Sequence, residues 1–344
     1  MTPLGIKTLF DTIHRKGCRS GVNSLLVGLS NSLELTHVYG QPMYIQVELT
    51  THCNAKCPMC ARTIFYEGKD SKKPKNMSFQ NFKKIILKLP YCESIELQGL
   101  GEPLFNPDLI KMIRLCKERN IFSRFTTNST LLSNWMGKRI ITSGLDCIEF
   151  SVDSPNAKKF EKIRKGTNFY TVLMNIKRFI NLKHEMNSSK PIVRAKVVVS
   201  EENISEIPQL LRLLKSVGIR NVLLRELMGD GLRKVPKNRL SLLLNYRDYG
   251  KSLGLNVQLA FPDLPPLSNR KKIKCWKIWK AMYITVDGWV TPCCFFPSEK
   301  TLNYGNILKQ DVKDIWNNEK YKISRKRLRN SLPDYPCKLC VWTN

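Results

Sequence analysis

Three closely spaced cysteines, Cys53, Cys57 and Cys60, are the residues of this chain best suited to hold a metal centre. They follow an alternating apolar run at 43–49 that predicts a buried strand, so the three thiols lie on one loop at a strand end. Cysteine thiolates at spacings of this kind hold iron–sulfur clusters. A cubane of four irons with three protein ligands leaves one iron open to a substrate or a cofactor.

Two simpler uses of these thiols are the alternatives. A zinc ion would take a fourth protein ligand close by, and C-x3-C-x2-C is an unusual zinc spacing. A disulfide would leave one of the three thiols over and would require an oxidising compartment. The spacing therefore favours an iron–sulfur cluster over both.

The loop resembles the cluster loop of the radical SAM superfamily, in which CxxxCxxC follows the first strand of a partial barrel. The resemblance implies a 4Fe–4S cluster whose open iron binds the amino and carboxylate groups of S-adenosylmethionine. An electron from the cluster then cleaves this cofactor to methionine and a 5′-deoxyadenosyl radical, which abstracts a hydrogen atom from a substrate. The cofactors carry the radical chemistry, while the protein supplies binding, orientation and exclusion of side reactions.

A cluster site needs several strand ends around this loop. The alternation of predicted strands and helices along the chain would supply them. Predicted helices separate predicted strands at 43–49, 94–98, 121–127, 145–152, 192–200 and 222–227. Parallel strands need such crossover helices, and a barrel-like curl brings their ends to one face. With the resemblance, this predicts an α/β fold: a partial (β/α)6 TIM-like barrel of the radical SAM type.

A glycine-rich run at 98–103 follows the second predicted strand. Glycines let the backbone approach a ligand closely, and Glu102 offers an acceptor to an ammonium group. The run looks like the family's GGEP motif, although Leu100 stands in place of the first glycine. The resemblance implies that Gly99, Gly101 and Glu102 bind the methionine amino group. An ordinary glycine turn is the alternative.

Two further strand ends resemble cofactor-binding elements of the family. Asn128 belongs to a TNG-like element in which Ser129 replaces the glycine. Ser151 and Asp153 form an S-x-D-like element, and alternation along a strand places both on one face. The resemblance implies that Asn128, Ser151 and Asp153 contact S-adenosylmethionine. A helix cap at Asp153 is the alternative.

Arg194 and Met59 complete the predicted cofactor site. Arg194 shares one strand face with Lys196, and the resemblance implies that a cation at this level meets the methionine carboxylate. A surface-exposed pair is the alternative. Met59 stands where relatives have an aromatic residue, and its backbone is expected to meet the adenine. No residue is assigned as an acid or a base, and none of the four histidines has a catalytic setting.

A second group of cysteines lies near the C-terminus. Asp287-Gly288 between two alternating runs predicts a β-hairpin, which carries Cys293 and Cys294 back toward Cys275. The run 287–294 and a final C-x2-C knuckle resemble the SPASM/twitch extension of radical SAM enzymes, in its one-cluster form. The resemblance implies an auxiliary 4Fe–4S cluster with the ligands Cys275, Cys293, Cys337 and Cys340.

Four protein ligands close a cubane, so this cluster would relay electrons or stabilise the fold. Cys294 is the alternative to Cys293, and a zinc site with the same ligands is the alternative to the cluster. The chain thus divides into four regions, of which a partly helical N-terminal lead-in covers 1–40 and a radical SAM core barrel covers 41–230. A linker region follows at 231–274, and a small cysteine-rich auxiliary cluster domain covers 275–344.

Composition sets the remaining bounds. No apolar run is long enough for a membrane span, the first residues lack the layout of a signal peptide, and twelve cysteines favour metal ligation in the reducing cytoplasm. The formal net charge of +29 indicates nucleic acid, an anionic surface or an acidic substrate as partners. Basic clusters lie at 270–274 and 320–329, and a lysine-rich solvated surface is the alternative.

These observations predict an enzyme, a radical SAM oxidoreductase or maturase. Its auxiliary cluster would assist a net oxidation or modification of a small-molecule or sugar substrate held between the barrel mouth and the extension. Modification of a ribosomally made peptide or protein is the alternative, and a flavodoxin- or ferredoxin-type protein is the expected electron donor. A third hypothesis, a nucleic-acid-binding metal protein without radical chemistry, rests on charge alone.

Overall fold

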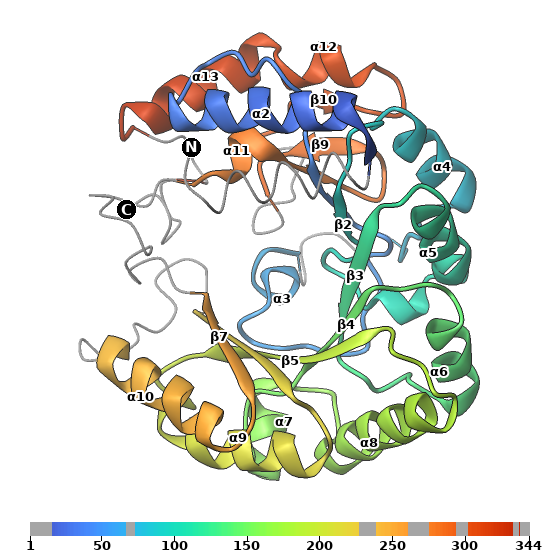
Figure 1. Cartoon of the computed structure of the whole chain (residues 1–344), viewed down its shortest axis with the longest axis vertical. Coiled ribbons are helices and arrows are strands. Elements are labelled where there is room, and N and C mark those ends of the chain that lie inside the picture. The colour runs from blue at the N-terminus through green and yellow to red at the C-terminus, as the bar shows by residue number, and fades with distance from the viewer. Residues whose placement is uncertain are drawn as a thin grey trace.

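A curved sheet surrounded by helices forms the body of the protein in the computed structural model, which describes residues 16–66, 73–226, 239–260, 275–293, 302–332 and 337. The described strands form one ten-stranded sheet in the order β10-β9-β8-β1-β2-β3-β4-β5-β6-β7. Figure 1 shows this sheet curling into an open barrel, with α4 to α10 around its outside and α2, α12 and α13 at one end.

The strands follow the chain in the order predicted from the sequence. They are β1 (Tyr44–Val47), β2 (Ser94–Glu96), β3 (Phe122–Thr127), β4 (Cys147–Ser151), β5 (Ile192–Val199), β6 (Asn221–Glu226), β7 (Asn256–Ala260), β8 (Ala281–Ile284), β9 (Trp289–Thr291) and β10 (Gly305–Asn306). From β8 through β1 and on to β7, every pair of neighbouring strands in the sheet is parallel. Strand β9 pairs antiparallel with β8, and β10 pairs antiparallel with β9. The predicted α/β class with a parallel barrel-like sheet is confirmed.

Helices α4 to α10 lie around the outside of this sheet, α3 lies within the opening of the barrel, and the other described helices lie at one end (Figure 1). The helices are α2 (Cys18–Ser32), α3 (Ala61–Tyr66), α4 (Phe79–Leu87), α5 (Leu109–Glu118), α6 (Asn134–Ile141), α7 (Ala157–Ile163), α8 (Phe169–Glu185), α9 (Ile207–Ser216), α10 (Arg239–Ser252), α11 (Lys277–Lys280), α12 (Val312–Trp316) and α13 (Glu319–Arg329). Short 3₁₀ turns lie at η1 (Pro103–Phe105) and η2 (Ile204–Glu206). Among the described helices, none combines the length and the hydropathy that crossing a bilayer requires.

The sheet is larger than the six strands expected. A linker region with one helix, at about 240–253, was expected at 231–274; α10 matches that helix, while the additional strand β7 extends the parallel sheet beyond β6. On the other edge β8 pairs in parallel with β1, so the first strand of the C-terminal region belongs to the barrel sheet. Sequence pattern did not reveal the β1–β8 pairing because it joins distant parts of the chain, whereas β7 follows β6 and α10 directly and was missed as a strand. Residues 1–15 of the predicted lead-in lie outside the described residues.

Alternation along each strand separates an apolar outer face from a polar inner one. On β5, the outward residues Ala195 and Val197 are fully buried in the core against the outer helices. Arg194 and Lys196 of the same strand face inward, toward the barrel lumen. The hydrophobic core therefore lies between sheet and helices, and the lumen is left for polar side chains.

Side-chain caps begin several of the helices. The Ser78 side chain accepts a hydrogen bond from Asn81 N and begins α4, and Ser133 begins α6 in the same way. The helix that follows β4 begins at Asn156, whose side chain accepts from Lys159 N. Asp153 is therefore not a helix cap, and that alternative is wrong. The β8–β9 hairpin turns at Gly288, whose φ of 84° favours glycine.

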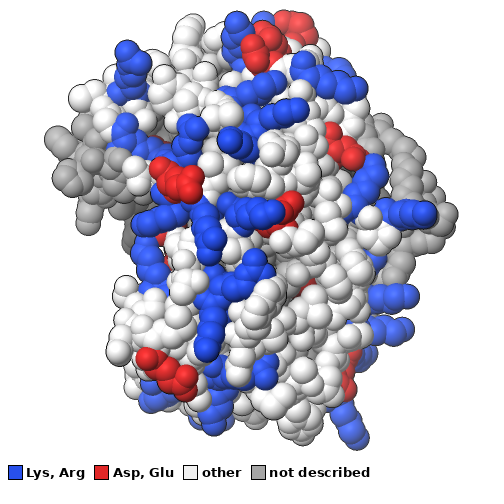
Figure 2. Space-filling model, turned by 90° about the vertical axis from the view of Figure 1, so that its right-hand side faces the viewer, with Lys and Arg blue, Asp and Glu red and all other residues white. Residues whose placement is uncertain are grey.

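Charge is spread unevenly over the outer surface. Figure 2 shows the face formed by α4, α5, α6 and α8, on which Lys and Arg side chains outnumber Asp and Glu. The basic run 320–329 is less exposed than its composition indicates, because Arg325 is fully buried. The basic run 270–274 lies outside the described residues.

Arg325 joins the N-terminal helix to the C-terminal region. Its guanidinium donates to the carbonyl oxygens of Ile278, Thr36 and Trp316 at 3.1, 3.0 and 2.8 Å. It also lies over the rings of Trp316 and Tyr321, 4.6 and 4.7 Å from their centroids. Because burial opposes its charge, the pKa of Arg325 falls to about 10.

We expect Arg325→Met to destabilise the fold strongly. The change leaves several buried carbonyl oxygens without donors, which costs about 3 kcal/mol or more in free energy of unfolding. Urea unfolding followed by circular dichroism measures the effect. Lys326→Met is the matched control, because Lys326 is the exposed neighbour on the same helix. Equal midpoints for the two variants would contradict the role given to Arg325.

Candidate active site

The cysteine loop at 53–60 begins just beyond β1 and ends where α3 begins. It turns back on itself, since Cys60 N donates to Cys57 O at 3.0 Å. The segment after α7 holds it from outside, because Lys56 N donates to Lys165 O at 2.7 Å. A Cβ on Gly166 would come within 3.0 Å of Asn54 O, so this close approach depends on glycine.

Hydrogen-bond donors point at the sulfur atoms of this loop. Ala55 N donates to Cys53 Sγ at 3.4 Å, and Asn128 Nδ2 lies 4.0 Å from the same sulfur. Burial raises the pKa of Cys53 to about 11 and also raises that of Cys57, where the nearby Arg164 charge opposes the shift. These thiols thus favour the neutral form until a metal binds, and the surrounding donors suit the thiolates that metal binding would create.

The three thiols are candidates for a cluster because of their spacing in the sequence. Among the described residues, no three His, Cys, Asp or Glu side chains meet closely enough to hold one metal ion. A cubane takes each thiolate on a different iron, so its ligands stand further apart. Cys53, Cys57 and Cys60 are all free thiols, and their role as cluster ligands stays a prediction.

Arg164 is a residue of this site that the sequence analysis left without a role. Its Nε donates to Asp153 Oδ2, and its charge acts on Cys57 and Cys60. Asp153 is fully buried, and its other oxygen accepts from Val198 N at 2.8 Å. The cofactor contact predicted for Asp153 stays a prediction. In the structure Asp153 orients the guanidinium of Arg164 beside the cysteine loop.

The glycine-rich run packs directly against the cysteine loop. Gly101 N donates to Thr50 O at 3.1 Å and Glu102 N donates to His52 O at 2.8 Å. A Cβ on Gly101 would lie 2.3 Å from Thr50 O, and one on Gly99 would lie 2.5 Å from the Glu48 side chain. Both glycines are therefore needed for packing, in addition to the ligand approach predicted for them.

Glu102 and Asn128, both predicted cofactor-binding residues, meet beside Cys53. Glu102 Oε2 accepts from Asn128 N at 2.7 Å, and its Oε1 accepts from Leu104 N at 3.3 Å. Asn128 Nδ2 donates to Asn54 Oδ1 at 2.9 Å. Burial raises the pKa of Glu102 to about 7, against the two backbone hydrogen bonds that lower it.

Glu48 is a second functional candidate that the sequence analysis missed. It follows β1, is buried, and accepts from Leu100 N and Val286 N, both at 3.1 Å. Burial raises its pKa to about 7. The side chain thereby ties the glycine-rich run to the β8–β9 hairpin. The available signal was a carboxylate within the apolar run 43–49.

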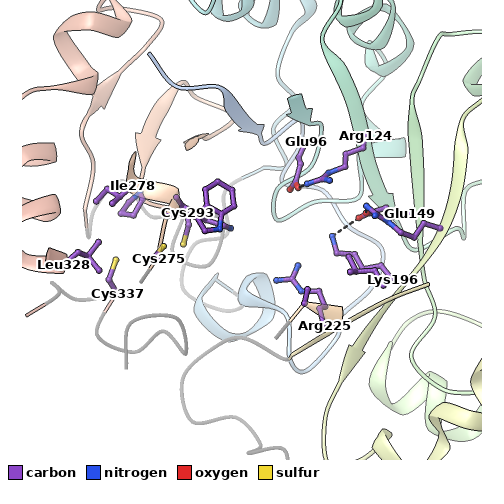
Figure 3. A pocket seen from close by; sticks show the side chains of 16 residues that line it. Glu96, Arg124, Glu149, Lys196, Arg225, Cys275, Ile278, Cys293, Leu328 and Cys337 are labelled. Carbon is purple, nitrogen blue, oxygen red and sulfur yellow. Dashed lines mark hydrogen bonds and ion pairs between the residues drawn. The ribbon is translucent and has the colours of Figure 1, made fainter. Parts of the chain in front are cut away.

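Three of the predicted auxiliary cysteines line one cavity of about 280 Å³. Figure 3 shows Cys275, Cys293 and Cys337 on one side of it, facing Arg124, Glu149, Lys196 and other charged side chains of the barrel. Burial raises the pKa of Cys275. Cys340 and Cys294 lie outside the described residues, so the fourth ligand stays a prediction.

The barrel side of the cavity is a network of ion pairs. Glu149 pairs with Arg194 through one oxygen and with Lys196, at 2.9 Å, through the other. Burial opposes the charge on Glu149, but these two cations together hold its pKa well below the usual range. Arg194 and Lys196 are thus largely buried, and the alternative of a surface-exposed pair is wrong.

The remaining predicted residues take separate positions. Ser151 is buried at the end of β4, opposite Lys196 in the register of β4 and β5. Met59 is half-buried within the cysteine loop. Arg194 lies on the cavity wall with the auxiliary cysteines, and its contact with the cofactor carboxylate stays a prediction.

The Asp153–Arg164 pair predicts a strong coupling in stability. Arg164→Gln alone leaves a fully buried carboxylate unpaired, which costs about 3–5 kcal/mol in free energy of unfolding. Asp153→Asn together with Arg164→Gln removes both charges, so the double variant should lose less than the sum of the single losses. Chemical unfolding of all four proteins measures this cycle. Additive losses would show that the pair is not coupled.

Glu102 predicts a pH dependence of stability. Its pKa of about 7 in the folded chain lies above the ordinary 4.5, so the stability it contributes is complete below 4.5 and falls as the pH rises to about 7. The stability of the cluster-free protein relative to Glu102→Gln should therefore fall across this window by up to about 1.4 kcal/mol per pH unit. Glu118→Gln, at an exposed position of α5, is the control. A flat difference would contradict the shift.

Comparisons with known proteins agree with this geometry. The Radical SAM superfamily model matches residues 47–214, and the iron–sulfur cluster-binding SPASM domain model matches residues 275–341. The tungsten-containing aldehyde ferredoxin oxidoreductase cofactor-modifying protein of Pyrococcus furiosus is 27% identical over 318 residues, covering 85% of each chain. The PqqA peptide cyclase of Gluconobacter oxydans is 24% identical over 293 residues, covering 80% of this chain and 76% of the relative.

A solved structure shares the fold. Streptococcus suis SuiB bound to S-adenosylmethionine superposes with a TM-score of 0.67 at 18% identity, covering 83% of this chain and 68% of SuiB. The two matching family models together span most of the chain, from the strand before the cysteine loop to the last cysteines. Such a core carries a 4Fe–4S cluster with S-adenosylmethionine, and such an extension carries auxiliary iron–sulfur ligation. The chain therefore belongs to the radical SAM superfamily, with a C-terminal SPASM domain.

Proposed function

We propose that this enzyme modifies a peptide or protein, acting on one side chain that enters the cavity between the barrel and the auxiliary cysteines. The observation that carries the proposal is one cavity, which inward-facing side chains of strands β2 to β7 line on the barrel side and Cys275, Cys293 and Cys337 border on the other. A substrate group held there would lie inside the barrel, directly beside the predicted auxiliary cluster site.

The size of the cavity supports a side chain as the reacting group. About 280 Å³ is at the lower end of the range for small-molecule pockets, and it suits one or two side chains rather than a folded segment. Trp276, Ile278 and Leu328 give it an apolar wall, which would exclude water from a reactive intermediate.

The named relatives support the same substrate class. One is described as a cofactor-modifying protein and another as a peptide cyclase. SuiB, whose fold this chain shares, has also been solved bound to its precursor peptide SuiA. These are activities and partners of those proteins, and the proposal extends them to this chain because the cavity lies at the boundary of the same two domains.

The chain's own residues would prepare the cofactor and the substrate. When bound, the first cluster and S-adenosylmethionine supply the electron and the 5′-deoxyadenosyl radical that removes a hydrogen atom from the substrate. Glu102 presents a carboxylate to the cofactor amino group, and the donors around Cys53 stabilise its thiolate. The auxiliary cysteines, with Cys340, would hold a second cluster within reach of the same substrate.

A small-molecule oxidation is the second candidate. It is favoured by the relative called probable GTP 3′,8-cyclase of Methanocaldococcus jannaschii, which is 27% identical over 178 residues, about half of this chain. The cavity volume also admits a small molecule. For either substrate we propose a flavodoxin- or ferredoxin-type electron donor and the reducing cytoplasm, in which free cysteines and iron–sulfur clusters persist.

The first test is anaerobic reconstitution with iron and sulfide. We expect about eight irons per chain and formation of 5′-deoxyadenosine once S-adenosylmethionine and dithionite are added. Changing Cys53, Cys57 and Cys60 together to Ala should lower the iron to about four and abolish cleavage. Cys18→Ala, an exposed thiol elsewhere, is the control and should change neither. A fully loaded wild type without cleavage would refute the function.

The substrate class is tested with deuterium. Peptides deuterated at side chains, and deuterated sugars and nucleotides, are offered separately to the loaded enzyme. Deuterium appearing in 5′-deoxyadenosine with a peptide supports the proposal, because the abstracted atom is carried into that product. Transfer from a sugar or a nucleotide alone would favour the second candidate.

A further inference from the structure

We propose that Arg164 raises the reduction potential of the first cluster, and that Asp153 is the positioning residue that holds the guanidinium in place for this. The first cluster is the one predicted at Cys53, Cys57 and Cys60. The inference goes beyond the proposed function, because it depends on the family membership and applies to any substrate. It gives a role in the chemistry to a buried ion pair outside the cavity.

The backbone brings the segment after α7 directly onto the cysteine loop. Lys56 N donates to Lys165 O at 2.7 Å. These two residues are the immediate neighbours of Cys57 and Arg164 along the chain. The backbone of Arg164 is itself fixed, because Thr167 Oγ1 donates to its carbonyl oxygen at 2.7 Å. Arg164 therefore enters the site from a segment that is bonded to the loop beside Cys57.

The ion pair is buried and held on several sides. Arg164 Nε donates to Asp153 Oδ2, and the two side chains are 15% and 0% exposed. Asp153 Oδ1 accepts from Val198 N at 2.8 Å, and Asn203 Nδ2 donates to Asp153 O at 2.8 Å. Because little water reaches the pair, its electric field is screened much less than that of a surface charge.

The pairing with Asp153 does not cancel the positive charge that acts on the sulfur. Burial raises the pKa of the Cys57 thiol, and the charge of Arg164 is the strongest influence that lowers it. The charge of Asp153 acts in the opposite direction, with a smaller effect than that of Arg164. A hydrogen bond of the Arg164 side chain also favours the Cys57 thiolate. The guanidinium thus favours negative charge at this end of the loop.

This environment bears on the electron that the first cluster must accept. Reduction takes one electron from an external donor, breaks no bond and makes the cluster one unit more negative. The potential of an iron–sulfur cluster depends on nearby charge and on hydrogen bonds to its sulfur atoms. A fixed cation that also bonds to a ligand sulfur stabilises the reduced state more than the oxidised one. Arg164 therefore makes the cluster easier to reduce.

The test is a redox titration of the anaerobically reconstituted full chain with dithionite as the reductant. The readout is the electron paramagnetic resonance signal of the reduced cluster. The signal of the first cluster is the one that disappears when Cys53, Cys57 and Cys60 are all changed to Ala. The signal that remains in that variant belongs to the auxiliary cluster and serves as the internal reference.

The main variant combines Asp153→Asn with Arg164→Gln, because removing both charges leaves no buried carboxylate without a partner. We expect its equilibrium constant for reduction to fall about tenfold, which is a potential lower by about 59 mV for one electron. Arg164→Lys keeps the charge and should stay close to the wild type. Iron content and circular dichroism confirm that each variant is loaded and folded.

Lys162→Gln is the matched control. It removes one positive charge from the same segment, but this side chain is 74% exposed, so that water and salt screen its field. Its potential should equal that of the wild type.

Three results would overturn the inference. An unchanged potential in the fully loaded double variant would mean that the pair does not act on the first cluster. An equal shift in Lys162→Gln would reduce the effect to overall charge. A shift confined to the reference signal would place the influence of Arg164 at the auxiliary cluster. Because the titration involves no substrate, its result is independent of the deuterium test.

Discussion

Strand β1 has a parallel neighbour on each side, and the relation between the two predicted cluster sites depends on this double pairing. Tyr44 lies opposite Ser94 of β2 and opposite Ala281 of β8. The first cysteine loop continues from β1, while β8 lies between Cys275 and Cys293. Glu48 strengthens the joint, because its buried carboxylate accepts from the glycine-rich run and from the hairpin beyond β8. The barrel and the extension thus share one sheet.

The second constraint is the pairing of charge inside the barrel. A closed TIM barrel fills its interior with packed apolar side chains. Here the lumen is polar, and inward-facing Glu149 is stabilised by cations on the next strand, as the register requires. The cost of burying charge is offset by these pairs. The lumen therefore contains a cavity, lined by Arg and Lys side chains and bordered by Cys275, Cys293 and Cys337, instead of a packed apolar core.

The features that the sequence alone predicted are those encoded by residues a few positions apart along the chain. Both cysteine groups, most strands and the cap at Ser78 follow from spacing, alternation and turn chemistry within a few residues. The pairing of β8 with β1, and the roles of Glu48 and Arg325, depend on contacts between distant segments. A single sequence contains such residues without their partners. Even so, a buried carboxylate beside β1 was a visible signal.

The measurement that tests the central claim most directly is anomalous X-ray diffraction from anaerobically grown crystals, collected at the iron and zinc absorption edges. We predict two iron–sulfur cubanes, one on Cys53, Cys57 and Cys60 and one at Cys275, Cys293 and Cys337, where the second borders the cavity. Zinc at the second site, or sulfur atoms there that bind no metal, would contradict the claim that this chain carries two iron–sulfur clusters.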